Sequence, residues 1–273
     1  MKERRRLPIL PARSLVPNIV TILALAAGMT SIKFALAAKW ELAVGAILLA
    51  AVFDALDGRV ARLMKGTSRF GAELDSLSDV ISFGLAPAIV LYLWTLRDLG
   101  GLGWMLALVF AVCCALRLAR FNVMSEQEEK PSEFFVGVPS PMGAVLALWP
   151  MALTFQLEEP VFRLPYLVAP YMAVVAFLMV SQVPTFSLKK VRVKNEYVLP
   201  VLILAGLMAA SATVYIWGTL SFACLLYLGL IPFSVRLSRS RKAAMQAERA
   251  AARQAKTIVT HPLSRDEPRP PLH

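Results

Sequence analysis

The chain has 273 residues, of which 58% are apolar or aromatic and only 17% are charged. A soluble domain carries about 25% charged residues, so this sequence has too few polar side chains to cover a water-soluble globule. The formal net charge is +11, and the isoelectric point is near 9.9. Such a charge is typical of a nucleic-acid-binding protein, or of a membrane protein whose Lys and Arg gather in cytoplasmic loops.

Long apolar stretches predict an all-α, polytopic integral membrane protein. A helix needs about 17–25 apolar residues to cross a bilayer. Eight stretches reach this length, near residues 17–37, 40–63, 73–96, 102–123, 138–157, 165–187, 196–214 and 217–236. Ala35-Leu36-Ala37 imitates a signal-peptidase site, but the first stretch is nearly of span length and the second follows at once. These features favour an uncleaved first helix.

The positive charges predict how the helices are oriented. With the N-terminus in the cytoplasm, 25 of the 29 Lys and Arg fall in cytoplasmic segments. The other four, Lys33, Lys39, Arg97 and Arg163, fall outside. This bias predicts eight transmembrane helices with both termini cytoplasmic. The basic excess is then a property of the topology, which argues against nucleic acid as a partner.

The composition divides the chain into three regions. Residues 1–16 are predicted to form a cytoplasmic or interfacial segment, and residues 17–236 the transmembrane domain. Residues 237–273 are predicted to form a basic cytoplasmic tail, disordered in part because its end is rich in proline and lacks apolar periodicity.

Rare residues exclude several kinds of chemistry. The two histidines, at positions 261 and 273, both lie in the tail, so the apolar body has no base for a Ser-His-Asp or Cys-His system. Cys113, Cys114 and Cys224 lie in apolar runs without paired spacing, which argues against disulfides or a zinc cluster. Catalysis would therefore depend on carboxylates, basic groups and hydroxyls.

Four of the six aspartates, Asp54, Asp57, Asp75 and Asp79, lie within one 26-residue window. Each unpaired carboxylate in a membrane costs about 2.5–3.5 kcal/mol, so the cluster needs cations. Helical spacing places each pair on one helix face, and a loop of about eight residues makes the two helices antiparallel. Four facing carboxylates would suit one or two Mg²⁺ or Mn²⁺ ions. The alternative is ion pairing with the neighbouring arginines, at positions 59, 62 and 69.

Small residues beside the aspartates suggest a ligand pocket. Gly58 and Ala61 would leave the helix face bare for a flat ligand, although small residues are also common where membrane helices touch. Arg62 would hold a phosphate, or would only extend to the interface as a snorkelling side chain. Gly71 lies at the start of the predicted third helix. It would belong to the pocket, or it would only allow the turn at the start of this helix.

Together these residues resemble the signature of the CDP-alcohol phosphatidyltransferase family, which the chain matches in full as Asp54-x2-Asp57-Gly58-x2-Ala61-Arg62-x8-Gly71-x3-Asp75-x3-Asp79. The segments LDSLSDVISFGLAPA (74–88), RLARFN (117–122) and FFVGVPSP (134–141) are similar to the bacterial, membrane-integral phosphatidylserine synthases within that family. With them the resemblance extends from about residue 15 to 145.

The resemblance implies that a phosphatidyl group moves from CDP-diacylglycerol to an alcohol, with release of CMP and with Mg²⁺ or Mn²⁺ at the aspartates. By motif position, Asp54, Asp57 and Asp75 would be the main metal ligands. Asp79 would be the general base and would also contact the metal. Four further motif positions would form the CDP site: Gly58, Ala61, Arg62 and Gly71.

The expected acceptor is L-serine, and this expectation rests on the resemblance. Arg117 and Arg120 would bind the serine carboxylate and Asn122 would orient its hydroxyl or amine, whereas the alternative role of the arginines is to anchor their helix at the interface. Glycerol 3-phosphate, inositol phosphate or choline would be accepted by the same chemistry. A different kind of function is also possible on this sequence. The aspartates could line the ion path of a divalent-cation transporter, since acidic residues within a membrane often do so. We further expect an active site on the cytoplasmic side of the inner membrane, and a homodimer, as is frequent in this family.

Overall fold

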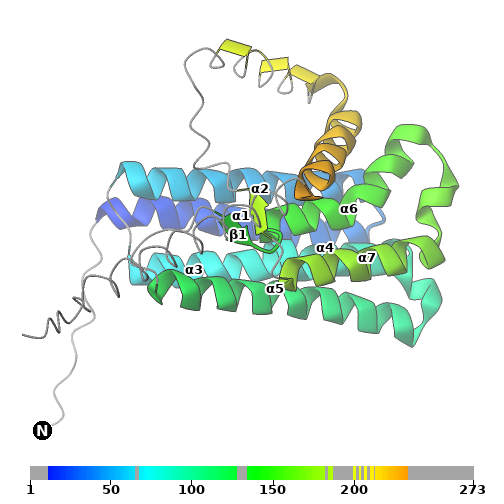
Figure 1. Ribbon diagram of the computed structural model, residues 1–273, viewed down its shortest axis with the longest axis horizontal. Coiled ribbons are helices and arrows are strands. Elements are labelled where there is room, and N and C mark those ends of the chain that lie inside the picture. Colours follow the sequence, from blue (N-terminus) through cyan, green and yellow to red (C-terminus); the bar gives the residue numbers. More distant parts are fainter. Residues whose placement is uncertain are drawn as a thin grey trace, which may run out of the picture.

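The computed structural model describes residues 12–64, 68–127, 134–181, 184–186 and 213–232, together with a few positions between 199 and 211. Almost all of these residues are helical. The long helices lie side by side along the longest dimension of the molecule (Figure 1). The described part is therefore a helical bundle, as the apolar stretches predicted.

The first two helices, α1 (Ala12–Leu36) and α2 (Trp40–Leu63), form the most extensive helix pair of the bundle. They are antiparallel because only three residues join them, and Ala38 in this turn adopts a φ of 54°. Since α1 packs along α2, it is part of the bundle.

The third span is one long helix with a local change of winding. It consists of α3 (Arg69–Asp79), the π-helical segment η1 (Val80–Leu85) and α4 (Ala86–Trp94). Ser68 caps its N-terminus, because its Oγ accepts a hydrogen bond from the Gly71 N–H at 3.0 Å. The 26 residues from Arg69 to Trp94 rise about 39 Å at 1.5 Å per residue, which is enough to cross a bilayer.

The remaining elements complete the bundle and close its loops. The turn η2 (Leu96–Leu99) leads into α5 (Gly101–Gln127), and α6 (Ser140–Leu157) is joined through η3 (Pro160–Arg163) to α7 (Pro165–Val180). A further helix covers Ile216–Pro232. Strands β1 (Phe134–Val136) and β2 (Pro184–Phe186) pair antiparallel, a small departure from the all-α prediction.

One predicted span is shorter than expected. The sequence predicted a helix to residue 187, but α7 ends at Val180 because Ser181 adopts an extended conformation and Pro184 lies in β2. Proline at that position cannot donate the hydrogen bond that a continued helix would need.

The bundle has the surface expected of a membrane protein. Four helices are long and apolar enough to cross a bilayer, Leu15–Leu36, Arg69–Trp94, Gly101–Met124 and Ser140–Leu157, and two shorter apolar helices follow. Large apolar side chains such as Ile19, Leu49 and Phe177 are exposed on the outside, where a water-soluble protein would place polar groups. A helical membrane protein is thus confirmed, whereas the count of eight spans is not.

Several predicted segments lie outside the described residues. They include most of the span predicted at 196–214, the tail at 237–273 and the first 11 residues of the N-terminal segment.

Close packing of α1 against the third span positions the site. A Cβ atom added to Gly28 of α1 would lie 2.8 Å from the Cα of Ser82 in η1, so the two backbones touch here. The Ser82 hydroxyl donates a hydrogen bond to the Ala24 carbonyl at 3.3 Å. Buried apolar side chains of α2, η1 and α5, including Ile47, Phe83 and Phe110, fill the interior beside this contact.

Candidate active site

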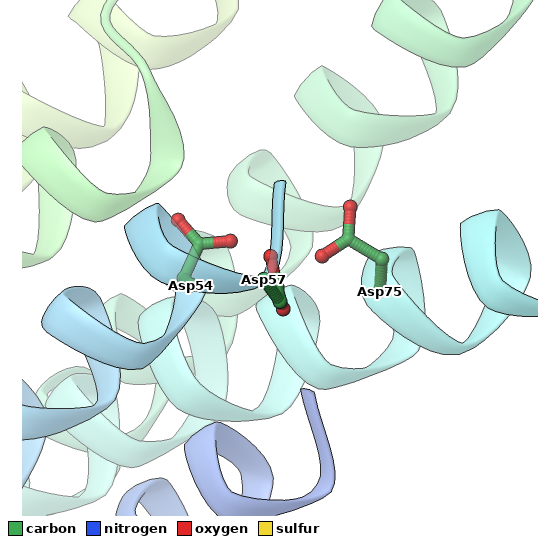
Figure 2. A group of neighbouring side chains, drawn as sticks. All are labelled: Asp54, Asp57 and Asp75. Carbon is green, nitrogen blue, oxygen red and sulfur yellow. The ribbon is translucent and has the colours of Figure 1, made fainter. Parts of the chain in front are cut away.

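The aspartates of the sequence signature gather where α2 ends and α3 begins. Asp54 and Asp57 lie in the last three turns of α2, and Asp75 lies in the second turn of α3. One carboxylate oxygen from each of these three residues lies within 4.8 Å of the other two (Figure 2). The antiparallel arrangement predicted from the short loop therefore brings the two helices' acids together.

This arrangement fits a divalent cation. Two negative charges 4.8 Å apart repel one another by roughly 3 kcal/mol at an effective dielectric constant of about 20. Hard oxygen donors in a group of three are the ligands that Mg²⁺ and Mn²⁺ prefer, and a cation between them would replace repulsion by attraction. The donor set is therefore suitable for the predicted metal.

Asp57 is held by a residue that the sequence did not single out. The Asp57 side chain is buried, and Thr21 of α1 donates a hydrogen bond from its Oγ1 to the Asp57 Oδ2 at 2.8 Å. The Ser78 hydroxyl of α3 in turn donates to the Thr21 carbonyl at 3.3 Å. Thr21 therefore connects the first helix to both helices that carry the acids.

Asp79 stands apart from the group of three. It ends α3 immediately before the π-helical segment η1, and its carboxyl group is in hydrogen-bond contact with that of Asp54. Arg117 of α5 lies close enough to attract both carboxylates. Asp79 is thus next to the cluster rather than within it. Single π-helical turns are frequent at functional sites.

Ion pairing does not account for two of the aspartates, Asp57 and Asp75. A salt bridge in the described part of the chain joins Arg97 and Asp98 at 3.9 Å, far from the site in sequence. Asp57 and Asp75 therefore have no ion pair with Arg59, Arg62 or Arg69, the arrangement that the sequence left open.

The residues predicted for the CDP site differ in their surroundings. Gly58 is exposed, and a Cβ atom added there would meet nothing within 4 Å, so the α2 backbone is accessible at this point. Ala61 is partly exposed and Arg62 fully so. At Gly71, by contrast, a Cβ atom would lie 2.7 Å from the Asn18 Oδ1 and 3.1 Å from the Ser68 Oγ. Gly71 thus has a packing reason to be glycine.

Of the residues predicted for the acceptor, Arg117 lies close to Asp79 and Asp54. It is half-buried, and its Nη1 donates a hydrogen bond to the Oγ of Ser140, a fully buried residue at the start of α6, at 2.7 Å. Its guanidinium also lies over the Phe121 ring, 5.7 Å from the centroid. Within the described part of the chain the buried Nε of Arg117 has no hydrogen-bond partner, so this group retains an unused donor.

Arg120 and Asn122 point to different places. Arg120 is exposed, and its Nη1 donates to the Val180 carbonyl at the end of α7, at 3.4 Å. Asn122 donates from its Nδ2 to the Ser76 Oγ on α3, at 2.8 Å, one residue beyond Asp75. The structure therefore brings Arg117 and Asn122 to the acid-bearing helices, and Arg120 to the end of α7.

Comparison with known proteins identifies the family. The family model described as CDP-alcohol phosphatidyltransferase matches residues 14–186, which include α1 to α7 and every aspartate of the cluster. The chain belongs to the CDP-alcohol phosphatidyltransferase family. A second model, CDP-alcohol phosphatidyltransferase 2, matches residues 196–232. These matches confirm the family resemblance inferred from the signature. They also confirm the prediction that the protein is a transferase.

Several curated relatives carry the name CDP-diacylglycerol--serine O-phosphatidyltransferase. The protein of that name from Mycobacterium bovis is 37% identical over 228 residues, which cover 82% of this chain and 79% of the relative. The Helicobacter pylori protein (strain 26695) is 34% identical over 71% of this chain and 81% of its own length. The Bacillus subtilis protein is 32% identical over 66% of this chain and 94% of its own length.

Proposed function

We propose that the protein transfers the phosphatidyl group of CDP-diacylglycerol to the hydroxyl of L-serine, giving phosphatidylserine and CMP. The observation that carries the proposal is the complete aspartate signature, folded so that three of its carboxylates lie within 4.8 Å of one another. The names of relatives that match most of the chain support serine as the acceptor.

Asp54, Asp57 and Asp75 would hold one or two Mg²⁺ or Mn²⁺ ions. Such an ion supplies positive charge that neutralises a pyrophosphate and stabilises the departing CMP. The exposed backbone at Gly58 supports a nucleotide lying along this end of α2, with Ala61 and Arg62 beside it. Gly71 completes the predicted CDP site, although its own contacts are with Asn18 and Ser68.

Asp79 would be the general base. It lies beside the three-carboxylate group without belonging to it, so it remains able to accept a proton. As the serine oxygen attacks the phosphorus, its proton passes to the Asp79 carboxylate and the bond from phosphorus to the CMP oxygen breaks. Arg117 would bind the serine carboxylate, because its guanidinium lies near Asp79 and retains a free donor. Asn122, bonded to Ser76 beside Asp75, would line the same approach, whereas Arg120 reaches the Val180 carbonyl and would anchor its helix there.

The site would face the cytoplasm from within the inner membrane. Asp54, Asp57, Asp75 and Asp79 all lie near the α2–α3 loop, which the distribution of Lys and Arg assigns to the cytoplasmic side. The acyl chains of the lipid substrate would stay among the helices while serine and CMP exchange with the cytoplasm.

The test is an assay of four acceptors in parallel. Purified protein would receive CDP-diacylglycerol, Mn²⁺ or Mg²⁺, and labelled serine, glycerol 3-phosphate, inositol phosphate or choline. We expect CMP release together with labelled lipid from serine alone, and neither product after chelation of the metal. Labelled lipid from another alcohol in place of serine would reject serine as the acceptor. Cation flux into vesicles without CMP release would favour a transporter.

One substitution tests the assigned base in the same assay. Asp79→Asn keeps the size of the side chain but cannot take a proton, so kcat should fall by a factor on the order of 10² or more. Asp98→Asn is the matched control, since Asp98 lies in the exposed η2 turn at the other end of the bundle. Full activity in the Asp79→Asn enzyme would contradict the mechanism.

A further inference from the structure

Thr21 is a polar residue of α1 whose side chain contacts an acid of the three-carboxylate group. It is 4% exposed, in a helix that is otherwise apolar over most of its length. Its Oγ1 lies 2.8 Å from the Asp57 Oδ2 and 3.2 Å from the Pro17 carbonyl oxygen of the preceding turn. The hydroxyl therefore has two acceptors within reach.

A threonine hydroxyl has a single hydrogen, so it donates mainly to one of the two acceptors, the Asp57 carboxylate or the Pro17 carbonyl. A hydrogen bond to an ionised carboxylate is shorter and about twice as strong as one to a neutral carbonyl. The shorter distance is the one to Asp57, so the hydrogen belongs to this bond. With Oδ2 engaged by Thr21, rotation of the Asp57 carboxylate is restricted, and the Gly58 backbone N–H donates a second hydrogen bond to it. This carboxylate lies between Asp54 and Asp75 in Figure 2.

Asp57 is also the member of the three-carboxylate group with the least exposed side chain, at 6%. A buried carboxylate oxygen without a donor is costly, and a carboxylate free to rotate binds a metal less tightly. The main chain of Thr21 is held as well, because its carbonyl accepts the hydrogen bond from Ser78 of α3. The position of the Thr21 hydroxyl is therefore set by both neighbouring helices.

We propose that Thr21 is a positioning residue that orients the Asp57 carboxylate for metal binding. This inference rests on the proposed function, since it assumes that the aspartates bind a divalent ion. Partners that orient a metal-binding side chain typically contribute 10–100-fold to metal affinity. Thr21 should therefore act on metal affinity and only indirectly on the substrates.

The experiment measures binding of Mn²⁺ alone to the full chain in detergent, by titration calorimetry or by the paramagnetic resonance of free Mn²⁺. Thr21→Val removes the hydroxyl and keeps the shape, and we expect its Kd for Mn²⁺ to rise roughly tenfold or more. Thr21→Ser keeps the hydroxyl and should stay within about threefold of the native protein. Thr30→Val is the matched control, because Thr30 is exposed on the same helix and bonds only to the Ala26 carbonyl in the described structure.

Steady-state kinetics give the second measurement. In Thr21→Val the Mn²⁺ concentration for half-maximal activity should rise by the same factor as the Kd, whereas KM for serine at saturating Mn²⁺ should stay unchanged. Equal Mn²⁺ affinity in Thr21→Val and the native protein would overturn the inference. An equal loss in Thr21→Val and Thr21→Ser would also overturn it, because the hydroxyl would then not be responsible.

Two further outcomes are distinguishable. If the native protein binds no Mn²⁺, the metal site of the proposed function fails together with this inference. If the native protein binds Mn²⁺ and the Thr21 variants bind it equally well, this inference alone fails. Should Thr21→Val not purify as a folded protein, Thr21→Ala and Thr21→Ser repeat the comparison, since these two variants differ by the hydroxyl alone.

Discussion

Gly58 and Gly45 lie on the same helix, α2, and both have free space where a side chain would begin. A Cβ atom added at either position would meet nothing within 4 Å. Packing inside the bundle therefore does not require glycine at either place, although glycine in a helix interior costs about 0.5–1 kcal/mol relative to alanine. Gly58 lies one residue after Asp57, whereas Gly45 lies near the opposite end of the helix. A nucleotide that contacts the backbone would explain the glycine at position 58.

This comparison yields a prediction in which stability and binding change in opposite directions. Gly58→Ala should stabilise the protein by about 0.5–1 kcal/mol, as should Gly45→Ala. KM for CDP-diacylglycerol should rise roughly tenfold in Gly58→Ala alone, equivalent to about 1.4 kcal/mol of lost binding. Thermal unfolding in detergent and initial rates measure the two effects. An unchanged KM in Gly58→Ala would remove Gly58 from the CDP site.

At the scale of elements, α1 supports the site without carrying any of its acids. It contacts α2, α3, η1 and α4, and its polar atoms meet the acid-bearing helices at Thr21. About two turns further along, Gly28 allows the backbones of α1 and η1 to touch. The depth of α1 in the bundle thus depends on Gly28, and the hydrogen bond to Asp57 depends on that depth.

Gly28→Ala tests this dependence. The new methyl group would lie within 2.8 Å of the Ser82 Cα, a backbone atom that cannot move aside alone. Overpacking of this kind costs about 1–3 kcal/mol, so the unfolding temperature in detergent should fall. Because α1 must shift, Mn²⁺ affinity should fall as well. Gly45→Ala on the neighbouring helix is the control, and equal unfolding temperatures in Gly28→Ala and the native protein would contradict the close contact.

The sequence predicted that the aspartates lie together, but it did not predict the residue that holds one of them in place, and both results have physical reasons. Asp54, Asp57 and Asp75 could be placed together because helical periodicity and a short loop determine which faces meet. The contact between Thr21 and Asp57 joins positions 36 residues apart and depends on how α1 is rotated about its axis. A helix that is apolar on nearly every side gives no periodic signal for that rotation.

Contacts between residues far apart in the sequence also account for the other differences between prediction and structure. Strands β1 and β2 pair across about 50 residues of intervening chain, without the tight turn that marks a hairpin in sequence. The hydrogen bond from Arg117 to Ser140 joins α5 to α6 across a loop. Hydropathy located these helices but could not show which of their polar side chains meet.

At the scale of the whole molecule, the acidic residues of the candidate site lie toward one end of an apolar bundle. The α2–α3 loop and the acids lie at the start of the third span, and the η2 turn lies at its other end, about 39 Å away by the rise of 26 helical residues. This length exceeds the hydrocarbon core of about 30 Å. A span of this length would place its two ends on opposite sides of the membrane. In the proposed orientation, which rests on the excess of Lys and Arg, the acids would lie on the cytoplasmic side.

Cysteine labelling in spheroplasts tests this orientation. In a background with Cys113, Cys114 and Cys224 replaced by alanine, single cysteines would be introduced by Asp98→Cys in η2, Glu159→Cys before η3 and Arg69→Cys at the start of α3. All three positions are exposed. A membrane-impermeant maleimide should label the first two in intact spheroplasts, and the third only after permeabilisation, because the proposed orientation places Arg69 at the cytoplasmic end. The alanine background must first retain CMP release, which shows that the bundle is intact. Labelling of Arg69→Cys in intact spheroplasts would place the acids on the outer side, where cytoplasmic serine and CMP could not exchange with the site.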